Sequence, residues 1–158
     1  MVKKAIFKKA FTLIEIMFAV VIFIIAFFGT SAYRYGASLD ARRADLQTKA
    51  TQTAVLFSEA WNGVGGATSF KPVPAFSSDI VIEVSVGPDA PADFTWMGSY
   101  KVTFERTDYF VTLSWKKTDP DLKVLSVIVN WDASGRDTGS FAAAKKSYRL
   151  TTYVENPS

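Results

Sequence analysis

A long apolar run occupies the N-terminal part of the chain. Residues 16–28 contain no polar side chain, and the stretch from Phe11 to Ala32 is about 22 residues, which at about 1.5 Å per helical residue is enough to cross a bilayer. Glu15 is the only charged residue in this stretch. The pattern predicts a membrane-spanning helix over residues 11–32, although the apolar run alone also suits a cleaved secretory signal.

Residues 33–62 show helical spacing of apolar and polar positions. No proline occurs before Pro72, and Gly63, Gly65 and Gly66 then make further helix costly. We therefore expect the first helix to continue as an amphipathic helix through residue 62. Its apolar stripe consists of Leu39, Leu46, Ala50, Ala54, Phe57 and Trp61.

Beyond residue 62 the apolar period changes to two, as in strands with one buried face. Residues 124–129 are almost all apolar, which indicates a strand buried on both faces. The expected strands are 80–86, 100–104, 109–115, 123–131 and 147–154. The predicted fold class is α+β: one long N-terminal helix, transmembrane and then amphipathic, packed on a small antiparallel β-sheet formed by residues 63–158.

The charge of the chain is concentrated at its front. The formal net charge is +3, but Lys3, Lys4, Lys8 and Lys9 are four of the 18 basic residues, which leaves 14 against 15 acidic residues. The remainder is nearly neutral, so we predict no nucleic-acid binding. The basic residues before the apolar run should keep the N-terminus on the cytoplasmic side of the membrane.

The residues needed for common catalytic and metal sites are missing. The chain has no histidine and no cysteine, which removes the usual general base and the Ser-His and Cys-His arrangements. The segment Asp132-x-Ser134-Gly135-x-Asp137 is too short for a calcium loop and lacks its closing glutamate, and Asp119 and Asp121 flank a turn proline. We expect no enzyme, no catalytic residues, no cofactor and no metal.

The segment Lys8-Lys9-Ala10-Phe11-Thr12-Leu13-Ile14-Glu15 resembles the start of the type IV pilin superfamily. The resemblance covers the basic leader and about 20 following residues. It implies that a prepilin peptidase removes residues 1–10 by cutting between Ala10 and Phe11, and that the new Phe11 amine is methylated. Alanine stands at residue 10 where the family usually has glycine, and we expect cleavage to survive because alanine is also small.

Glu15 is then the assembly residue that the resemblance implies. A carboxylate within an apolar segment costs a few kcal/mol in lipid, so it needs a partner or a reason to exist. In a filament the partner would be the free Phe11 amine of a neighbouring subunit, in a buried ion pair that sets axial register. The alternative is that Glu15 lies in the headgroup zone at the membrane edge.

A second, weaker resemblance concerns the end of the chain. Residues 123–131, followed by Leu150-Thr151-Thr152, look like the closing strand pair of minor pilins and minor pseudopilins, although two ordinary amphipathic strands have the same pattern. The implied function is a minor subunit of a type IV pilus or type II secretion pseudopilus. Its implied partners are other pilin or pseudopilin subunits, the prepilin peptidase and N-methyltransferase, an inner-membrane assembly platform and, before assembly, membrane lipid. The implied location is the bacterial inner membrane, with residues 63–158 in the periplasm, and then the fibre.

Two rival interpretations remain open. A conventional signal peptide cut after Thr30-Ser31-Ala32 would release a secreted or periplasmic binding protein beginning at Tyr33. Alternatively, the apolar run anchors an unprocessed binding domain. Pilus and secretion pseudopilus are equally compatible with the residues.

Overall fold

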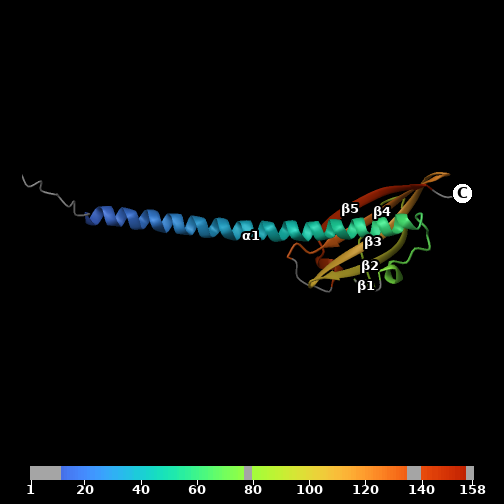
Figure 1. Cartoon of the computed structure of the whole chain (residues 1–158), viewed down its shortest axis with the longest axis horizontal. Helices are drawn as coiled ribbons and strands as arrows, with labels where there is room; N and C mark the ends of the chain where they lie inside the picture. The colour runs from blue at the N-terminus through green and yellow to red at the C-terminus, as the bar shows by residue number, and fades with distance from the viewer. Residues whose placement is uncertain (1–11, 77–79, 135–139, 156–158) are drawn as a thin grey trace, which may run out of the picture. The chain divides into compact units, whose positions relative to one another are not determined.

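The computed structural model describes residues 12–76, 80–134 and 140–155. The chain forms two compact units, residues 1–42 and 43–158, and the first helix contributes to both. The elements are α1 (Leu13–Gly63), α2 (Pro72–Ala75), β1 (Val81–Val84), β2 (Thr95–Phe104), β3 (Thr107–Asp119), β4 (Leu122–Trp131), a short 3-10 helix η1 (Phe141–Ala143) and β5 (Lys146–Glu155) (Figure 1). The predicted α+β class is confirmed.

The first unit consists of the apolar part of α1. This helix is long and apolar enough to cross a membrane, judged by length and composition. Every large apolar side chain from Leu13 to Phe28 is 46–79% exposed. Leu39 also belongs to this unit and is 37% exposed, so its predicted place on the buried stripe is wrong; the buried part of the stripe begins at Leu46.

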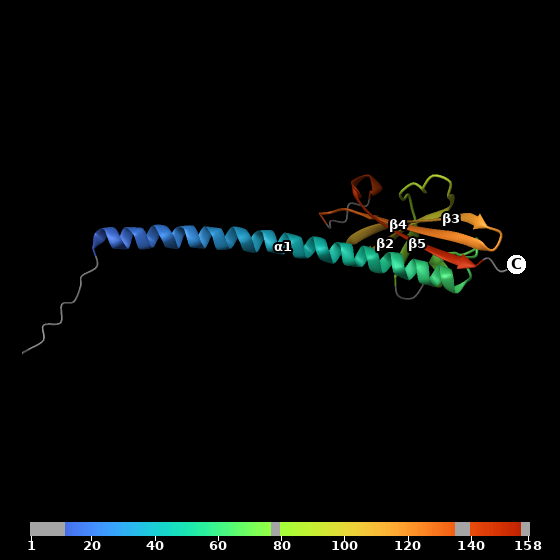
Figure 2. The same cartoon turned by 90° about the horizontal axis from the view of Figure 1, so that it is seen from above.

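The second unit is a helix on a five-stranded antiparallel sheet. The strand order in the sheet is β1-β2-β3-β4-β5, so every strand pairs with the strands that precede and follow it in the sequence. The C-terminal part of α1 lies along one face of this sheet, and the two views agree on this packing (Figures 1 and 2). The sheet ends in β1 on one side and β5 on the other.

The core lies between α1 and the facing side chains of the sheet. Phe57 and Trp61 are fully buried, and the Phe57 ring lies 6.4 Å from that of Tyr100 on β2. Leu46, Ala50 and Ala54 complete the buried stripe that the helical spacing predicted. Their sheet partners are Val102, Tyr109, Val111, Leu113, Leu125, Val127, Val129 and Trp131.

The helix α1 ends at a group of glycines, as the sequence predicted. The Trp61 carbonyl accepts a hydrogen bond from the Gly66 amide at 3.0 Å, and the Asn62 carbonyl accepts one from Gly65 at 2.9 Å. Gly65 and Gly66 both have φ of +64°, a backbone region that costs glycine little. The helix therefore ends at Gly63, one residue beyond the prediction.

The face of the sheet away from α1 carries buried polar side chains. Ser99, Thr112, Ser114 and Ser126 are buried, whereas simple alternation would place Thr112 and Ser114 in water. Residues 85–94 cross this face, and a Cβ at Gly87 would lie 2.6 Å from Thr112 Oγ1. Only a residue without a side chain permits this approach.

Candidate functional site

The predicted processing site lies outside the described part of the chain. Ala10 and Phe11 precede Thr12, where the described residues begin. Cleavage and methylation at these positions stay predictions. Glu15, the predicted assembly residue, is described and lies in the first turn of α1.

The first turn of α1 favours a carboxylate for local reasons. The Thr12 carbonyl accepts hydrogen bonds from the Glu15 amide at 3.0 Å and the Ile16 amide at 3.3 Å, so Thr12 precedes the helix as its cap. Thr12-x-x-Glu15 is the spacing of a capping box, and the helix dipole stabilises negative charge at this end. No cation forms an ion pair with Glu15 within residues 12–76, 80–134 and 140–155.

A further candidate interface is the apolar surface of α1 that follows Glu15. Large aliphatic and phenylalanine side chains are exposed around the whole helix from Leu13 to Phe28. A helix that is apolar all round is stable only when lipid or other helices surround it. The two possible surroundings correspond to a membrane and to a bundle of such helices.

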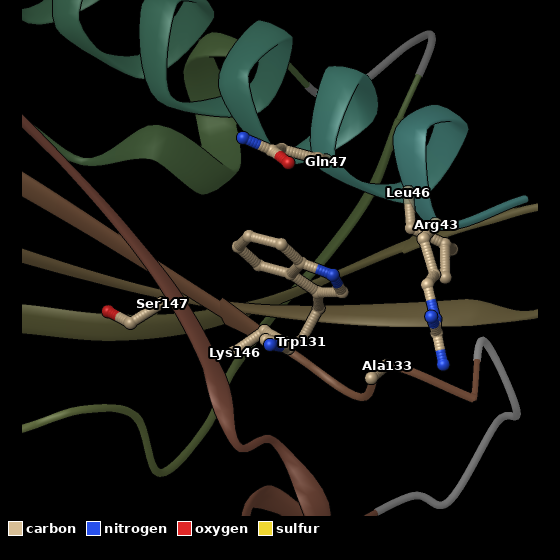
Figure 3. Close-up of a pocket in the computed structure, with 7 residues that line it drawn as sticks. All are labelled: Arg43, Leu46, Gln47, Trp131, Ala133, Lys146 and Ser147. Atoms are coloured by element: carbon tan, nitrogen blue, oxygen red, sulfur yellow. The ribbon is translucent and has the colours of Figure 1, made fainter. Parts of the chain in front are cut away.

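A polar groove lies on the second unit between α1, β4 and β5. Its volume is about 510 Å³. Figure 3 shows Arg43 and Gln47 reaching from α1 and Lys146 from the start of β5, with the Trp131 ring between helix and strands. The lining residues are Arg43, Leu46, Gln47, Trp131, Ala133, Lys146 and Ser147. We call this cavity the basic groove.

The basic groove combines cations with an apolar floor. Trp131 and Leu46 are buried beneath it, while Arg43 and Lys146 are exposed. No carboxylate is among the described lining residues, and in the described part of the chain no acidic side chain pairs with Lys146. Such a surface attracts acidic groups.

A second groove, of about 340 Å³, lies on the other side of α1. Leu56, Ile80 and Phe104 make its wall mainly apolar. At its edge Lys49 pairs with Asp45 at 3.3 Å and with Glu105 at 2.5 Å. The hydrogen bond to Glu105 is the main reason that the Lys49 pKa is raised. This exposed contact links the β2–β3 turn to the helix.

The two aspartate motifs were predicted to be turns, and among the described residues no group of three or more acidic side chains is placed to hold a metal ion. Asp119 ends β3 and Asp121 precedes β4, so the predicted turn is confirmed. The Asp132 carboxylate accepts hydrogen bonds from the Ser134 amide at 2.9 Å and the Ser134 hydroxyl at 2.5 Å, as in an ordinary Asx turn. Gly135 and Asp137 of that motif lie outside the described residues.

Sequence reasoning missed the basic groove because its residues come from three distant segments. Arg43 and Lys146 are brought together only by the pairing of β4 with β5, in which Trp131 is opposite Lys146, and by the packing of Leu46 into the core. A net charge near zero for the body of the chain gave no signal of a local cluster.

The comparisons with known proteins leave the family open. The sequence matches no family model, and no curated protein and no solved structure matches the chain. A long apolar N-terminal helix on an antiparallel sheet is compatible with a pilin-like architecture. The functional argument therefore starts from the residues and their geometry.

Proposed function

We propose that this chain is a structural, minor pilin-like subunit of a type IV pilus or of the related type II secretion pseudopilus. A prepilin peptidase removes residues 1–10, and the chain then enters the fibre from the inner membrane through its N-terminal helix. Its domain, residues 63–158, faces the periplasm before assembly. Its partners are other pilin-like subunits and the assembly platform.

One observation carries the proposal: an all-round apolar helix that begins with a lone carboxylate at the position that the pilin resemblance requires. The exposed surface from Leu13 to Phe28 needs lipid or other helices around it. Transfer of the helix from lipid to a bundle exchanges one apolar surrounding for another, so small packing and polar terms decide the outcome. Glu15 and the Phe11 amine of a neighbouring subunit supply such a polar term.

Replacement of Glu15 by glutamine tests this role while preserving the helix. Glutamine can take the place of glutamate in a capping box, so Glu15→Gln removes the charge but leaves the local helix start intact. We expect normal membrane insertion and at least a tenfold loss of incorporation into sheared fibres, because a broken buried pair costs about 3–5 kcal/mol.

The matched control is Glu59→Gln, which removes an exposed carboxylate from the same helix. This variant should enter fibres as the unchanged chain does. Immunoblots of the membrane and sheared fractions measure both variants. Normal incorporation of Glu15→Gln would reject the ion-pair role and leave only the capping role for Glu15.

A further inference from the structure

The end of the apolar part of α1 carries two hydroxyl side chains that need no external partner. Thr30 Oγ1 donates a hydrogen bond to the Ala26 carbonyl at 2.5 Å, and Ser31 Oγ donates one to the Phe27 carbonyl at 2.9 Å. Hydroxyls that are paired within the helix lie in hydrocarbon without an unsatisfied polar group. The surface that suits lipid therefore continues through Ser31, beyond the uninterrupted apolar run.

Tyr33, Arg34 and Tyr35 follow directly and are exposed. Successive helical residues lie about 100° apart around the axis, so the two tyrosines project from nearly opposite sides of α1 and Arg34 lies between them. Tyrosine and arginine are typical of the headgroup zone of a bilayer, because an apolar ring or stem contacts lipid while the polar end reaches water.

The length of α1 before Arg34 agrees with this position. Glu15 and Arg34 are about 28 Å apart along the helix at about 1.5 Å per residue, and the hydrocarbon core of a bilayer is about 30 Å thick. Large apolar side chains remain exposed between them. When Glu15 lies in one headgroup zone, Arg34 therefore reaches the other.

Arg34 differs from the next cations along the helix. Within residues 12–76, 80–134 and 140–155, no carboxylate pairs with Arg34 and its side chain has no hydrogen bond. Arg42 and Arg43 both have interaction partners. An arginine at the edge of hydrocarbon needs an anion, and the phosphate of a lipid headgroup is the anion that a bilayer supplies at this level.

An open hollow runs along α1 from Arg34 towards the N-terminus. Its volume is about 360 Å³, and it lies wholly in the first unit. The spacing of its lining residues places them on one side of the helix, and two of them stack with ring centres 6.4 Å apart. The lining residues are Phe23, Ala26, Phe27, Thr30, Ser31 and Arg34. The hollow thus has a cation at one end and apolar side chains along the rest, which matches a phosphate joined to an acyl chain.

We propose that Arg34 and this hollow bind one phospholipid of the leaflet on the domain side of the membrane. The guanidinium holds the phosphate through charge-assisted hydrogen bonds, and an acyl chain lies along Ala26 and the two phenylalanines. The proposal rests on the membrane stage of the proposed function, before the helix enters a fibre. It requires no second copy of the chain.

Native mass spectrometry of the full chain tests the site. The chain is reconstituted in vesicles of equal parts phosphatidylglycerol and digalactosyldiacylglycerol with the same acyl chains, in phosphate-free buffer, and is released in mild detergent. Only one of these lipids carries a phosphate. We expect the unchanged chain to retain one phosphatidylglycerol molecule about tenfold more often than the galactolipid, because a charge-assisted contact is made by the phosphate alone.

Two substitutions separate the headgroup contact from the hollow. Arg34→Gln removes the cation, so the two lipids should be retained equally. Ala26→Phe fills the hollow and leaves Arg34 in place, so retention of both lipids should fall about fivefold through lost apolar contact. The matched controls are Arg106→Gln, at an exposed position in the β2–β3 turn, and Ala32→Phe, outside the lining of the hollow. Both controls should bind lipid as the unchanged chain does.

Three results would overturn the proposal. The first is equal retention of the two lipids by the unchanged chain. The second is a phosphate preference that survives Arg34→Gln, or a retention that survives Ala26→Phe. The third is a spectrum in which the chain carries a second protein chain in place of lipid, because the hollow would then serve the packing of helices.

The proposed function fails separately. A chain that enters sheared fibres but shows no lipid preference would reject the lipid site and leave the fibre role intact. A chain that retains phosphatidylglycerol through Arg34 but is absent from the sheared fraction would support the lipid site and contradict the fibre role.

Discussion

At the scale of single residues, Glu15 is the clearest case of a group with two physical explanations. A carboxylate in the first turn is stabilised by the helix dipole wherever the helix lies, whereas a carboxylate at the edge of an apolar bundle requires a cation. The position of Glu15 in α1 satisfies the first explanation. The capping-competent glutamine variant separates the two because it retains the helix start and loses the charge.

Tyr109 offers a residue-scale prediction about pH. Its side chain is fully buried, its hydroxyl donates a 3.4 Å hydrogen bond to the Leu46 carbonyl, and burial raises its pKa to about 12. The unfolded chain loses this proton near pH 10, earlier than the folded chain. The resulting stability is present below pH 10 and is lost between pH 10 and about 12.

Tyr109→Phe should therefore flatten the fall of the unfolding free energy between pH 10 and 12. Chemical denaturation of the full chain in detergent measures it. Tyr153→Phe, at a 65% exposed position on β5, is the control and should follow the unchanged chain. An equal alkaline loss in all three proteins would show that burial of the Tyr109 hydroxyl does not contribute.

Residue identities also show where sequence prediction failed. The expected strands 100–104 and 109–115 left four residues between them, but the turn is made by Glu105 and Arg106 alone, with φ of 46° and 70°. Glycine or asparagine usually marks such a turn, and neither residue here gives that signal. Glu105 of this turn also pairs with Lys49 of α1, and a contact between distant segments has no local signature.

At the scale of elements, α1 is one helix with two kinds of surface. Its first part is apolar and exposed all round, and its last part buries one stripe against the sheet. The helical spacing from Leu46 to Trp61 predicted that stripe correctly, because a periodic pattern of apolar residues reports directly on one-sided burial.

Phe57 gives the element-scale prediction. Its buried ring lies 5.4 Å from that of Phe76 and 6.4 Å from that of Tyr100. Phe57→Ala should lower the unfolding free energy of the domain by about 3–5 kcal/mol through lost burial and a residual cavity. Val55→Ala on the exposed side of the same helix should change it by no more than about 0.5 kcal/mol. Denaturant titration followed by tryptophan fluorescence measures both, and equal effects would place the packed face elsewhere.

The alternation of apolar residues located the strands. It did not predict where each strand ends, or that a loop covers the face of the sheet away from α1. β2 begins at Thr95, whereas the alternation predicted a start at Tyr100. The predicted start was too late because Gly98 and Ser99 interrupt the apolar pattern, although both residues pair with β3. The buried hydroxyls of Thr112 and Ser114 depend on residues 85–94 crossing the sheet, as the close approach at Gly87 shows. Alternation indicates which residues share a face, but not whether a loop covers that face.

At the scale of the whole molecule, the chain has two units with different requirements. The second unit, residues 43–158, has a conventional core between helix and sheet, so it buries its own apolar surface. The first unit does not, since its large apolar side chains remain exposed. A protein of this kind needs an apolar surrounding for one unit and water for the other, which a membrane and a fibre with a packed helical centre both provide.

The central claim, that the N-terminal helix is processed at Phe11 for assembly, is tested most directly by the intact mass and N-terminal sequence of the chain purified from its native cells. We predict a mature chain that begins with methylated Phe11 and so retains Glu15 and the apolar helix. A chain that still begins at Met1 would indicate an unprocessed anchor. A chain that begins at Tyr33 would indicate a conventional secretory signal, and either result would contradict the proposed function.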